Sequence, residues 1–325
     1  MKVIVIGLGS MGKRRIRLIR QISAAASIVG VDVSEERRAF ACKEFNITCM
    51  ATLGEAFAEE ADCAFVCTSP LTHAKIIKSS LENGLHVFTE LNLVPVLYEE
   101  NMRLAESKNL VLFLSSTFLY RREINYILSR VKKSSSQLNY IYHIGQYLPD
   151  WHPWEDYQNY FIGNQCSNGC REIMAIELPW LITGFGGIQS ISALKSKITS
   201  LNISYDDNFL VSLCHENGAK GILAIDVVSR KAVRRFEMFG EDVYLSWNGT
   251  PDTLTDYDIT KKEDLPVSLF HSAEHQENYA SFVIEDPYRD EIIAFFDKIK
   301  NRSVPCMWDF ARDMQMLKLI DQIGA

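Results

Sequence analysis

Apolar runs of strand length alternate with segments of helical period along the first third of the chain. The apolar runs are KVIVIG, SIVGVDV, ADCAFVCTSP, LHVFTE and LVLFLSST. Segments between them, such as GKRRIRLIRQI, repeat apolar residues every three or four positions. This alternation predicts βαβ units around a parallel sheet, with helices on both faces because the crossovers are right-handed. We therefore predict an α/β, doubly wound domain over residues 1–120.

The pattern changes after about residue 120, where short segments alternate apolar and polar residues. They include NYIYHIGQY, DNFLVSLCH, KGILAIDVV and DVYLSW. Alternation with turn signals predicts a large, mostly antiparallel sheet with one face in water. Helical periods interrupt it at roughly 171–185, 287–300 and 307–322. Residues 121–325 are thus predicted to form an α+β domain, and the exposed sheet face predicts a homo-oligomer, a dimer or a tetramer.

Composition narrows the class of protein. The chain has 325 residues, 47% of them hydrophobic, which suits two domains with separate cores. A net charge of -7 disfavours a nucleic-acid partner. The sequence has no secretory signal pattern and no apolar run long enough for a membrane span. The eight cysteines form no CxxC pair, and Cys166 and Cys170 lack a second ligand pair, so we predict reduced thiols, a cytoplasmic location and no metal.

The segment Gly7-Leu8-Gly9-Ser10-Met11-Gly12 is a GxGxxG motif between a predicted strand and a predicted helix. In this context Gly7 permits a tight turn, Gly9 lets the backbone approach a pyrophosphate, and Gly12 lets helix and strand pack closely. Ser10 and Met11 begin the helix, whose free N–H groups attract the diphosphate. The motif predicts a Rossmann dinucleotide-binding site, against the alternative of a purely structural glycine turn.

Asp32 follows Gly12 by twenty residues and ends the second predicted strand. A carboxylate there accepts hydrogen bonds from the adenosine ribose hydroxyls and repels a 2′-phosphate. We therefore predict NAD as cofactor, with NADP less favoured. Arg37 and Arg38 are close in sequence and could partly offset that repulsion.

Three segments carry a family resemblance: GLGSMGKRR, then CTSPLTHAKI with LENGLHVFTE, and DPYRDEIIAFFDKI. In them the chain resembles the glucose-fructose oxidoreductase / inositol dehydrogenase family of nicotinamide-dependent sugar and polyol dehydrogenases. The resemblance implies a Rossmann domain followed by a domain whose sheet forms a pocket wall and an oligomer interface. It also implies that the loop after the fourth strand approaches the nicotinamide. In this chain that loop contains Thr68, Ser69, Pro70 and His73, although His73 could equally cap or pack the next helix.

The chain departs from the family at both usual acid/base positions. The family's fifth strand ends Glu-Lys-Pro, whereas this chain reads Glu90-Leu91-Asn92, so Glu90 matches and the lysine is absent. The family's Asp and His, four residues apart on the first helix of the substrate domain, fall by ungapped placement on Ile173 and Glu177. The chain therefore keeps the family's cofactor-binding residues and lacks its usual acid/base residues.

Three residues are candidate replacements for the missing relay. Glu177 shares a helical face with Ile173, Ile176 and Trp180, and a carboxylate in apolar surroundings makes a stronger general base, so it is the first catalytic candidate. Its alternative is a structural bond to Arg171 or to a neighbouring strand. The aromatic and polar segment 147–169 supplies the others, His152 and Tyr157, with Tyr160 after them.

The same segment predicts the substrate class. Its aromatic side chains, including Trp151 and Trp154, suit the mixed surface of a sugar ring, unless they only fill the seam between domains. We predict an NAD-dependent oxidoreductase that transfers a hydride between nicotinamide and a carbohydrate-like alcohol or ketone, a sugar, polyol or nucleotide sugar. The alternatives are a non-catalytic NAD-binding regulator and an enzyme that recycles NAD within an elimination or hydrolysis.

Overall fold

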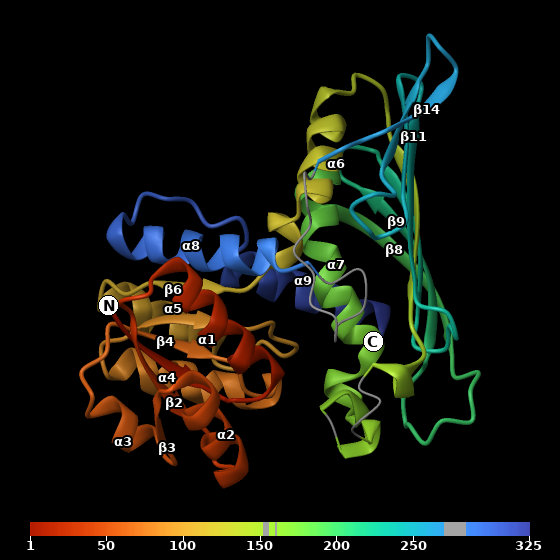
Figure 1. Ribbon diagram of the computed structural model, residues 1–325. Helices are drawn as coiled ribbons and strands as arrows, with labels where there is room; N and C mark the ends of the chain where they lie inside the picture. Colours follow the sequence, from red (N-terminus) through yellow and green to blue (C-terminus); the bar gives the residue numbers. More distant parts are fainter. Residues whose placement is uncertain (152–155, 160, 270–283) are drawn as a thin grey trace. The chain divides into compact units, whose positions relative to one another are not determined.

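The computed structural model describes residues 1–151, 156–159, 161–269 and 284–325. They form two compact units (Figure 1). Unit 1 comprises Met1–Thr117 and Tyr288–Gln315, and unit 2 comprises Phe118–Pro287 and Met316–Ala325. The first boundary lies three residues before the predicted one, and the second domain is not continuous, because most of the C-terminal helical region returns to unit 1.

Unit 1 contains a six-stranded parallel sheet in the order β3-β2-β1-β4-β5-β6. Its strands are β1 (Lys2–Ile6), β2 (Ser27–Val31), β3 (Thr48–Met50), β4 (Cys63–Val66), β5 (His86–Thr89) and β6 (Leu112–Leu114). The order reverses at β1, whose neighbours β2 and β4 lie on either side of it. The carboxyl ends of β1 and β4 therefore flank the switch point at which doubly wound sheets bind ligands.

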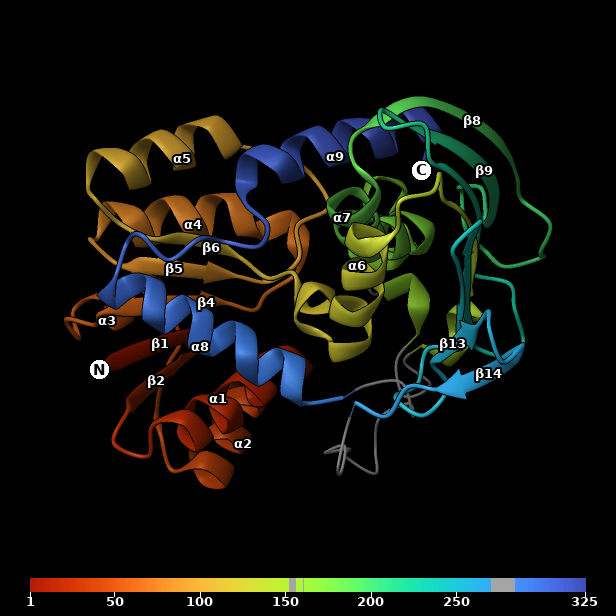
Figure 2. The same cartoon turned by 90° about the horizontal axis from the view of Figure 1, so that it is seen from above.

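Helices cover both faces of this sheet, as Figure 2 shows. They are α1 (Ser10–Ile22), α2 (Glu35–Phe45), α3 (Leu53–Phe57), α4 (His73–Glu82), α5 (Tyr98–Ser107), α8 (Asp286–Lys300) and the first part of α9 (Phe310–Ile323). Phe295 of α8 packs against Phe65, Phe88 and Phe113 of three neighbouring strands, with ring centroids 5.4 to 5.7 Å apart. This aromatic contact is the physical reason that α8 belongs to unit 1.

Unit 2 contains an eight-stranded sheet in the order β14-β13-β12-β11-β7-β10-β9-β8. Its strands are β7 (Asn139–Gly145), β8 (Ile188–Ser196), β9 (Asn208–His215), β10 (Lys220–Asp226), β11 (Val233–Gly240), β12 (Val243–Trp247), β13 (Thr255–Asp258) and β14 (Glu263–Pro266). All its pairs are antiparallel except the pair of β7 and β10. The predicted fold class, a Rossmann domain with a mostly antiparallel α+β domain, is confirmed.

Helices α6 (Arg122–Lys133) and α7 (Gly169–Phe185) cover one face of the second sheet (Figure 1). Side chains of β7 and β11 that point to the helices are buried, among them Tyr140, Tyr142 and Phe236. Asn168 caps α7 by accepting a hydrogen bond from the Arg171 N–H at 2.8 Å. No helix in the described ranges is long and apolar enough to cross a membrane.

Candidate cofactor and catalytic site

The three motif glycines occupy three different environments between β1 and α1. Gly7 has a φ of +91°, and a Cβ there would lie 2.8 Å from the Cys67 carbonyl group. A Cβ on Gly12 would collide with the Gly7 carbonyl oxygen. A Cβ on Gly9 would meet only Arg37 Nη1, at 3.9 Å. Gly7 and Gly12 are therefore required by the fold itself, whereas Gly9 leaves open space beside its backbone.

The start of α1 adjoins this open space. Gly9 is its N-cap residue and provides no side-chain cap. Ser10 is exposed and Met11 is half-buried, so the first turn is reachable. The N-terminus of a helix next to an open glycine backbone can hold a diphosphate, because first-turn N–H groups have no partner within the helix and the helix dipole favours an anion there. The described residues thus fit the pyrophosphate of a dinucleotide.

Asp32 lies directly after β2, beside the glycine turn. Its Oδ2 accepts a hydrogen bond from the Leu8 N–H at 2.8 Å, and its Oδ1 accepts one from the Ser34 N–H at 2.9 Å. Each carboxylate oxygen has a second lone pair, which is available to a ribose hydroxyl. Asp32 therefore braces the turn as well as facing the expected ribose position.

The two neighbouring arginines have different roles. Arg38 donates to the backbone carbonyls of Asp32 and Val33, at 2.8 and 3.0 Å, which fixes the backbone after β2. The Arg37 side chain is 55% exposed, and its Nη1 lies 3.9 Å from Asp32 Oδ2. Arg37 is thus the cation that a 2′-phosphate would reach.

The loop after β4 is built around a buried histidine. Thr68, Ser69 and Pro70 lead into a short 3-10 helix (Pro70–Thr72), and Thr72 Oγ1 donates to Thr68 Oγ1 at 2.8 Å. His73 Nε2 lies 2.9 Å from the Thr68 carbonyl, and its Nδ1 lies 2.7 Å from the Asn92 side-chain amide. Burial lowers the pKa of His73, so the neutral ring donates from Nε2 and accepts at Nδ1.

Asn92 completes this arrangement. With Oδ1 beside His73, its buried Nδ2 has no partner among the described residues. When the amide is rotated so that Oδ1 and Nδ2 exchange places, Nδ2 donates to His73 Nδ1 and no longer lacks a hydrogen-bond partner. His73 and Asn92 therefore fasten the loop after β4 to the segment after β5. The described contacts of His73 correspond to its packing alternative, and its predicted place beside nicotinamide stays a prediction.

Glu90 is held by a buried ionic network. Arg15 of α1 donates from Nε to Glu90 Oε1 at 2.6 Å and from Nη2 to Glu291 Oε1 at 2.5 Å. Glu291 of α8 also accepts hydrogen bonds from Ser115 and Thr117. Burial raises the pKa of the Glu291 carboxyl, and pairing with Arg15 opposes that shift. The network ties the end of β5 to α1 and α8, so Leu91 follows a rigid anchor and is itself partly exposed.

Glu177 has an environment that differs from the predicted apolar one. The carboxylate is 1% exposed and accepts four hydrogen bonds. Arg234 donates from Nε and Nη2 to Oε1 at 3.1 and 2.8 Å, and Tyr142 and Trp180 each donate to Oε2 at 2.8 Å. The bonds from Arg234 and Tyr142 tie Glu177 to neighbouring strands. They are of the structural kind that the sequence analysis gave as the alternative to a catalytic role. Arg171 instead pairs with Asp321. The catalytic role of Glu177 stays a prediction.

The aromatic segment is described only in part. Trp151 is half-buried, donates from Nε1 to the Gln146 carbonyl at 3.0 Å, and lies close to Gly169 at the start of α7. The Tyr157 hydroxyl accepts a hydrogen bond from the Asn202 N–H at 3.2 Å. His152, Trp154 and Tyr160 lie outside the described residues. The part that is described places Trp151 beside α7, which also carries Glu177.

Several residues that build the site have no sequence motif. Arg15, Glu291 and Arg234 were not predicted, because their partners lie 57 to 276 positions away in the chain. One local signal was present. Arg15 is a charged residue on the buried helix face that it shares with Gly12 and Ile19, and such a residue indicates a buried ion pair.

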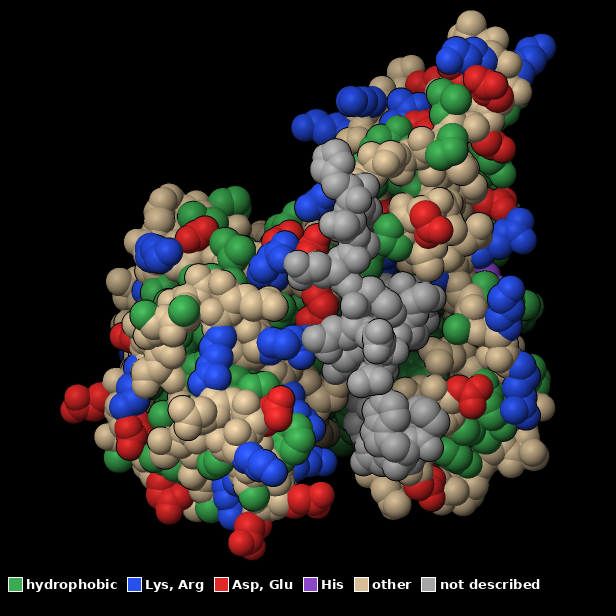
Figure 3. Space-filling view, in the orientation of Figure 1, with side chains coloured by type: hydrophobic (Ala, Val, Ile, Leu, Met, Phe, Trp, Pro, Cys, Tyr) green, Lys and Arg blue, Asp and Glu red, His purple; other side chains and the backbone are tan. Residues whose placement is uncertain are grey.

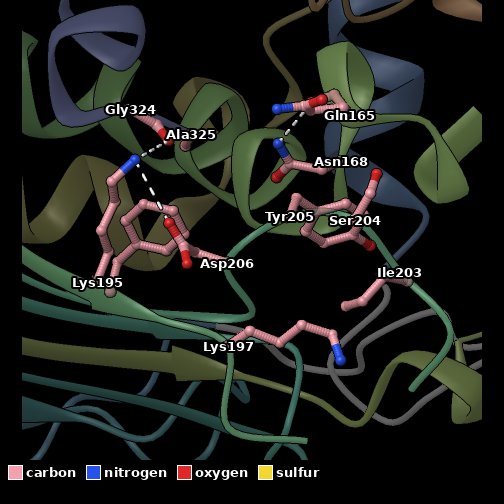
Figure 4. A pocket seen from close by; sticks show the side chains of 11 residues that line it. Gln165, Asn168, Lys195, Lys197, Ile203, Ser204, Tyr205, Asp206, Gly324 and Ala325 are labelled. Carbon is pink, nitrogen blue, oxygen red and sulfur yellow. Dashed lines mark hydrogen bonds and ion pairs between the residues drawn. The ribbon is translucent and has the colours of Figure 1, made fainter. Parts of the chain in front are cut away.

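Unit 2 contains a separate polar cavity of about 350 Å³ beside β8 and β9. Figure 4 shows Lys195 at its edge, where its ammonium group reaches the Gly324 carbonyl at 2.8 Å and Asp206 at 3.4 Å. The cavity lies within one unit, and none of the predicted site residues is among those that line it. No group of three or more His, Cys, Asp or Glu residues among those described could hold a metal ion.

Residues 1–115 match the sequence model of an oxidoreductase family with an NAD-binding Rossmann fold. The match covers most of unit 1. The matching family is the one that the glycine motif and the strand exits resemble, so the predicted cofactor class and the oxidoreductase class are confirmed. A comparison with curated proteins finds no significant match.

Solved structures with the same architecture extend over nearly the whole chain. UDP-N-acetylglucosamine 3-dehydrogenase from Acidithiobacillus ferrooxidans is 19% identical with a TM-score of 0.77, covering 99% of this chain and 96% of its own. A levoglucosan dehydrogenase complex with NADH is 15% identical, with a TM-score of 0.81 and coverages of 100% and 96%. Biliverdin reductase from Synechocystis, with biliverdin and NADP+, is 17% identical, with a TM-score of 0.74 and coverages of 99% and 98%. At these identities the likeness shows the fold.

Proposed function

We propose that this protein is an NAD-dependent oxidoreductase that transfers a hydride between nicotinamide and a carbohydrate-like alcohol or ketone. The open backbone at Gly9, next to the uncapped start of α1, carries the dinucleotide part of this proposal. The carboxylate of Asp32 at the end of β2 favours NAD over NADP. When bound, the nicotinamide supplies the hydride chemistry, and the protein supplies position and proton transfer.

The substrate class has independent support. Two structures of the same fold are sugar dehydrogenases by name, one for a nucleotide sugar and one for an anhydrosugar. A third reduces a linear tetrapyrrole, so the fold alone does not select sugars. In this chain, Trp151 presents a half-buried aromatic face beside α7, and an aromatic face suits the apolar side of a sugar ring. This supports a carbohydrate substrate, and biliverdin is the comparison compound in the test below.

The uncovered face of the second sheet supports assembly into homo-oligomers. Leu194, Leu210, Ile222 and Ile141 point away from the helices and are 74%, 53%, 49% and 47% exposed. Leu194 pairs with Leu210 across β8 and β9, and Ile222 pairs with Ile141 across β10 and β7. Charged side chains of both signs are interspersed over the view in Figure 3. We propose that a second copy of this chain covers the apolar sheet face.

The test is a substrate panel with NAD and NADP. Free sugars, polyols and UDP-, GDP- and CMP-sugars are each incubated with protein and oxidised cofactor, and NADH formation is followed by absorbance. Turnover with a sugar derivative supports the proposal. Biliverdin is tested separately with NADH or NADPH, whose consumption is followed by absorbance. Tight NAD binding without turnover on any sugar or polyol, or reduction of biliverdin as the one reaction observed, would overturn the substrate class.

A further inference from the structure

Four buried polar side chains of unit 1 lie in a row between α9 and the loop after β4. They are Asp313, Tyr98, Asn92 and His73, and each is at most 3% exposed. We call these four residues the buried polar row. At its α9 end, Asp313 accepts hydrogen bonds from the Trp308 indole N–H at 2.9 Å and from the Tyr98 hydroxyl at 2.7 Å.

The other end of the row fastens the loop after β4. His73 Nδ1 lies 2.7 Å from the Asn92 amide, and Nε2 lies 2.9 Å from the Thr68 carbonyl. Between the two ends, the Asn92 amide faces the Tyr98 hydroxyl. Burial raises the pKa of Tyr98, Asp313 raises it further, and Asn92 opposes this shift. The buried Asn92 Nδ2 still makes no well-formed hydrogen bond within the described ranges, so the direction of hydrogen bonding is open at this contact.

A protonated Asp313 would complete the row in one direction. Its O–H donates to the Tyr98 oxygen, and the Tyr98 O–H is then free to donate to Asn92 Oδ1. Asn92 Nδ2 in turn donates to Nδ1 of a neutral His73, whose Nε2–H donates to the Thr68 carbonyl. Every donor of the row has an acceptor in this arrangement.

An ionised Asp313 reverses the direction at its own end. It only accepts, so the Tyr98 hydroxyl must donate to it, and the Tyr98 oxygen then faces Asn92 as an acceptor. Asn92 consequently turns Nδ2 toward Tyr98 and Oδ1 toward His73. Oδ1 needs a proton on His73 Nδ1, while the Thr68 carbonyl needs one on Nε2, so only a charged ring serves both. A neutral His73 would leave one hydrogen bond of the row unmade.

The surroundings of His73 favour the neutral ring. Burial is the largest influence and lowers the pKa of His73, while its bonds with Thr68 and Asn92 raise it. Glu90 is the charged group that acts on the ring, and it also raises the pKa. Thr89 contributes only a hydroxyl, 3.3 Å from Nδ1. Because the ring stays neutral, its hydrogen bonds depend on the direction that Asn92 adopts.

Asp313 is the group of the row that titrates in the physiological range. Burial raises its pKa to about 6, and the hydrogen bonds from Tyr98 and Trp308 oppose that shift. Asp309, on the same segment, raises the pKa further. A proton on Asp313 is therefore bound below about pH 6 and released above it.

The row depends on a residue in which this chain departs from the family pattern. Asn92 occupies the position of the proline in the family's Glu-Lys-Pro strand end. A proline side chain neither donates nor accepts a hydrogen bond, so it could not join Tyr98 to His73. The amide is what makes the row continuous in this chain.

We propose that Asp313 is a positioning residue for the cofactor site, which orients Asn92 and His73 and thereby holds the loop after β4. This inference rests on the proposed function, because that function assigns the nicotinamide to this loop. A loop that is held in advance binds its ligand with a smaller ordering cost. The row is complete when Asp313 has bound its proton, so NAD affinity should be highest at low pH and should fall as pH rises through the Asp313 titration.

Asp313→Asn tests the proposal in the free protein. The Trp308 N–H needs an acceptor, so the new amide keeps its oxygen there and donates from nitrogen to Tyr98, as a protonated Asp313 does. The readout is the pair of ring nitrogen signals of His73, followed by NMR on labelled protein. In wild type we expect an inflection near pH 6, and in Asp313→Asn we expect a ring that stays protonated at Nε2 across that range. Asp309→Asn, which changes an exposed carboxylate, should keep the inflection.

Tyr98→Phe is a second variant that interrupts the row in its middle. It removes the hydroxyl and keeps the ring that packs on Phe310, with centroids 4.7 Å apart. The His73 signals should then no longer follow the titration of Asp313. A His73 inflection that persists unchanged in both Asp313→Asn and Tyr98→Phe would overturn the role of Asp313.

NAD affinity as a function of pH is the readout for the cofactor site. Wild-type affinity should fall about fivefold from pH 5 to pH 8 relative to Asp313→Asn, which is the order that one hydrogen bond contributes. The same pH dependence in both proteins would overturn the positioning role. A wild type that binds no NAD at any pH would overturn the proposed function instead, and the two failures are distinguishable because the His73 signals are measured without cofactor.

Discussion

Arg234 of β11 holds Glu177 of α7 through two hydrogen bonds to the same carboxylate oxygen, at 2.8 and 3.1 Å. Tyr142 and Trp180 occupy the other oxygen. All of these groups lie under the helix on the covered face of the second sheet. The position that aligns with the family's histidine therefore fastens the helix to the sheet.

Glu177→Gln is expected to lower the free energy of unfolding by about 3–5 kcal/mol, because it removes the carboxylate charge that faces the buried Arg234 guanidinium. Chemical denaturation measures this, with Glu99→Gln as the control that changes an exposed carboxylate. A loss below about 1 kcal/mol would contradict the structural role. A folded Glu177→Gln variant that loses the acidic limb of its pH–rate profile would instead assign Glu177 as the general base.

The two glycines Gly9 and Gly12 should respond differently to alanine. Gly9→Ala meets no neighbour within normal contact distance, so it should fold like wild type and lose at least about tenfold in NAD affinity by blocking the diphosphate. Gly12→Ala collides with the Gly7 carbonyl and should destabilise unit 1 by about 2 kcal/mol or more. Calorimetry of NAD binding and thermal unfolding separate the two effects. Equal NAD affinity in Gly9→Ala and wild type would exclude the predicted diphosphate position.

The sequence predicted unit 1 well because its signals are local. The glycine turn, the carboxylate after the second strand and the Asn83-Gly84 helix stop each lie within a few residues of the element they punctuate. The structure shows α4 ending at Glu82 and Gly84 at a φ of +79°. Short-range steric rules of this kind are readable from one chain.

The sequence was less informative where distant residues meet. It assigned the C-terminal region to the second domain, because nothing local shows that Phe295 packs on Phe88. It placed Glu177 in apolar surroundings, because Arg234 is 57 residues away and on another strand. The sequence analysis assigned no element to residues 122–133, where helix α6 lies. The periodicity of a sequence shows which face of an element is buried, but not which distant residue that face contacts.

Cofactor preference depends on the charge of Asp32. Asp32→Asn keeps an acceptor for the Leu8 or Ser34 N–H and removes the negative charge. The ratio of the NADP to the NAD dissociation constant should then fall by about tenfold, which corresponds to about 1.4 kcal/mol. Arg37→Ala serves as the companion variant and should weaken NADP more than NAD, because Arg37 is the exposed cation beside Asp32. A wild type that prefers NADP would show that Arg37 outweighs Asp32.

The apolar sheet face gives a prediction about assembly. Ile222→Lys places a charge on the exposed face beside its cross-strand partner Ile141 and diagonally opposite Leu210. If a second copy covers this face, the variant should shift to a smaller species in sedimentation velocity while its Tm at low concentration changes little. Lys220→Ala, at the exposed start of the same strand, is the control. A wild type that is monomeric at all concentrations would contradict the proposed interface.

Hydride transfer between the nicotinamide and a sugar carbon tests the account most directly. The protein is incubated with NADH deuterated at C4 and with keto derivatives of free and nucleotide-linked sugars, and the products are examined by mass spectrometry and NMR. We expect deuterium at one former carbonyl carbon of a sugar product from wild type, and less of it from Gly9→Ala when NADH is limiting. Bound NADH that keeps its deuterium in the presence of every candidate would contradict an oxidoreductase acting on carbohydrates and would favour an NAD-binding regulator.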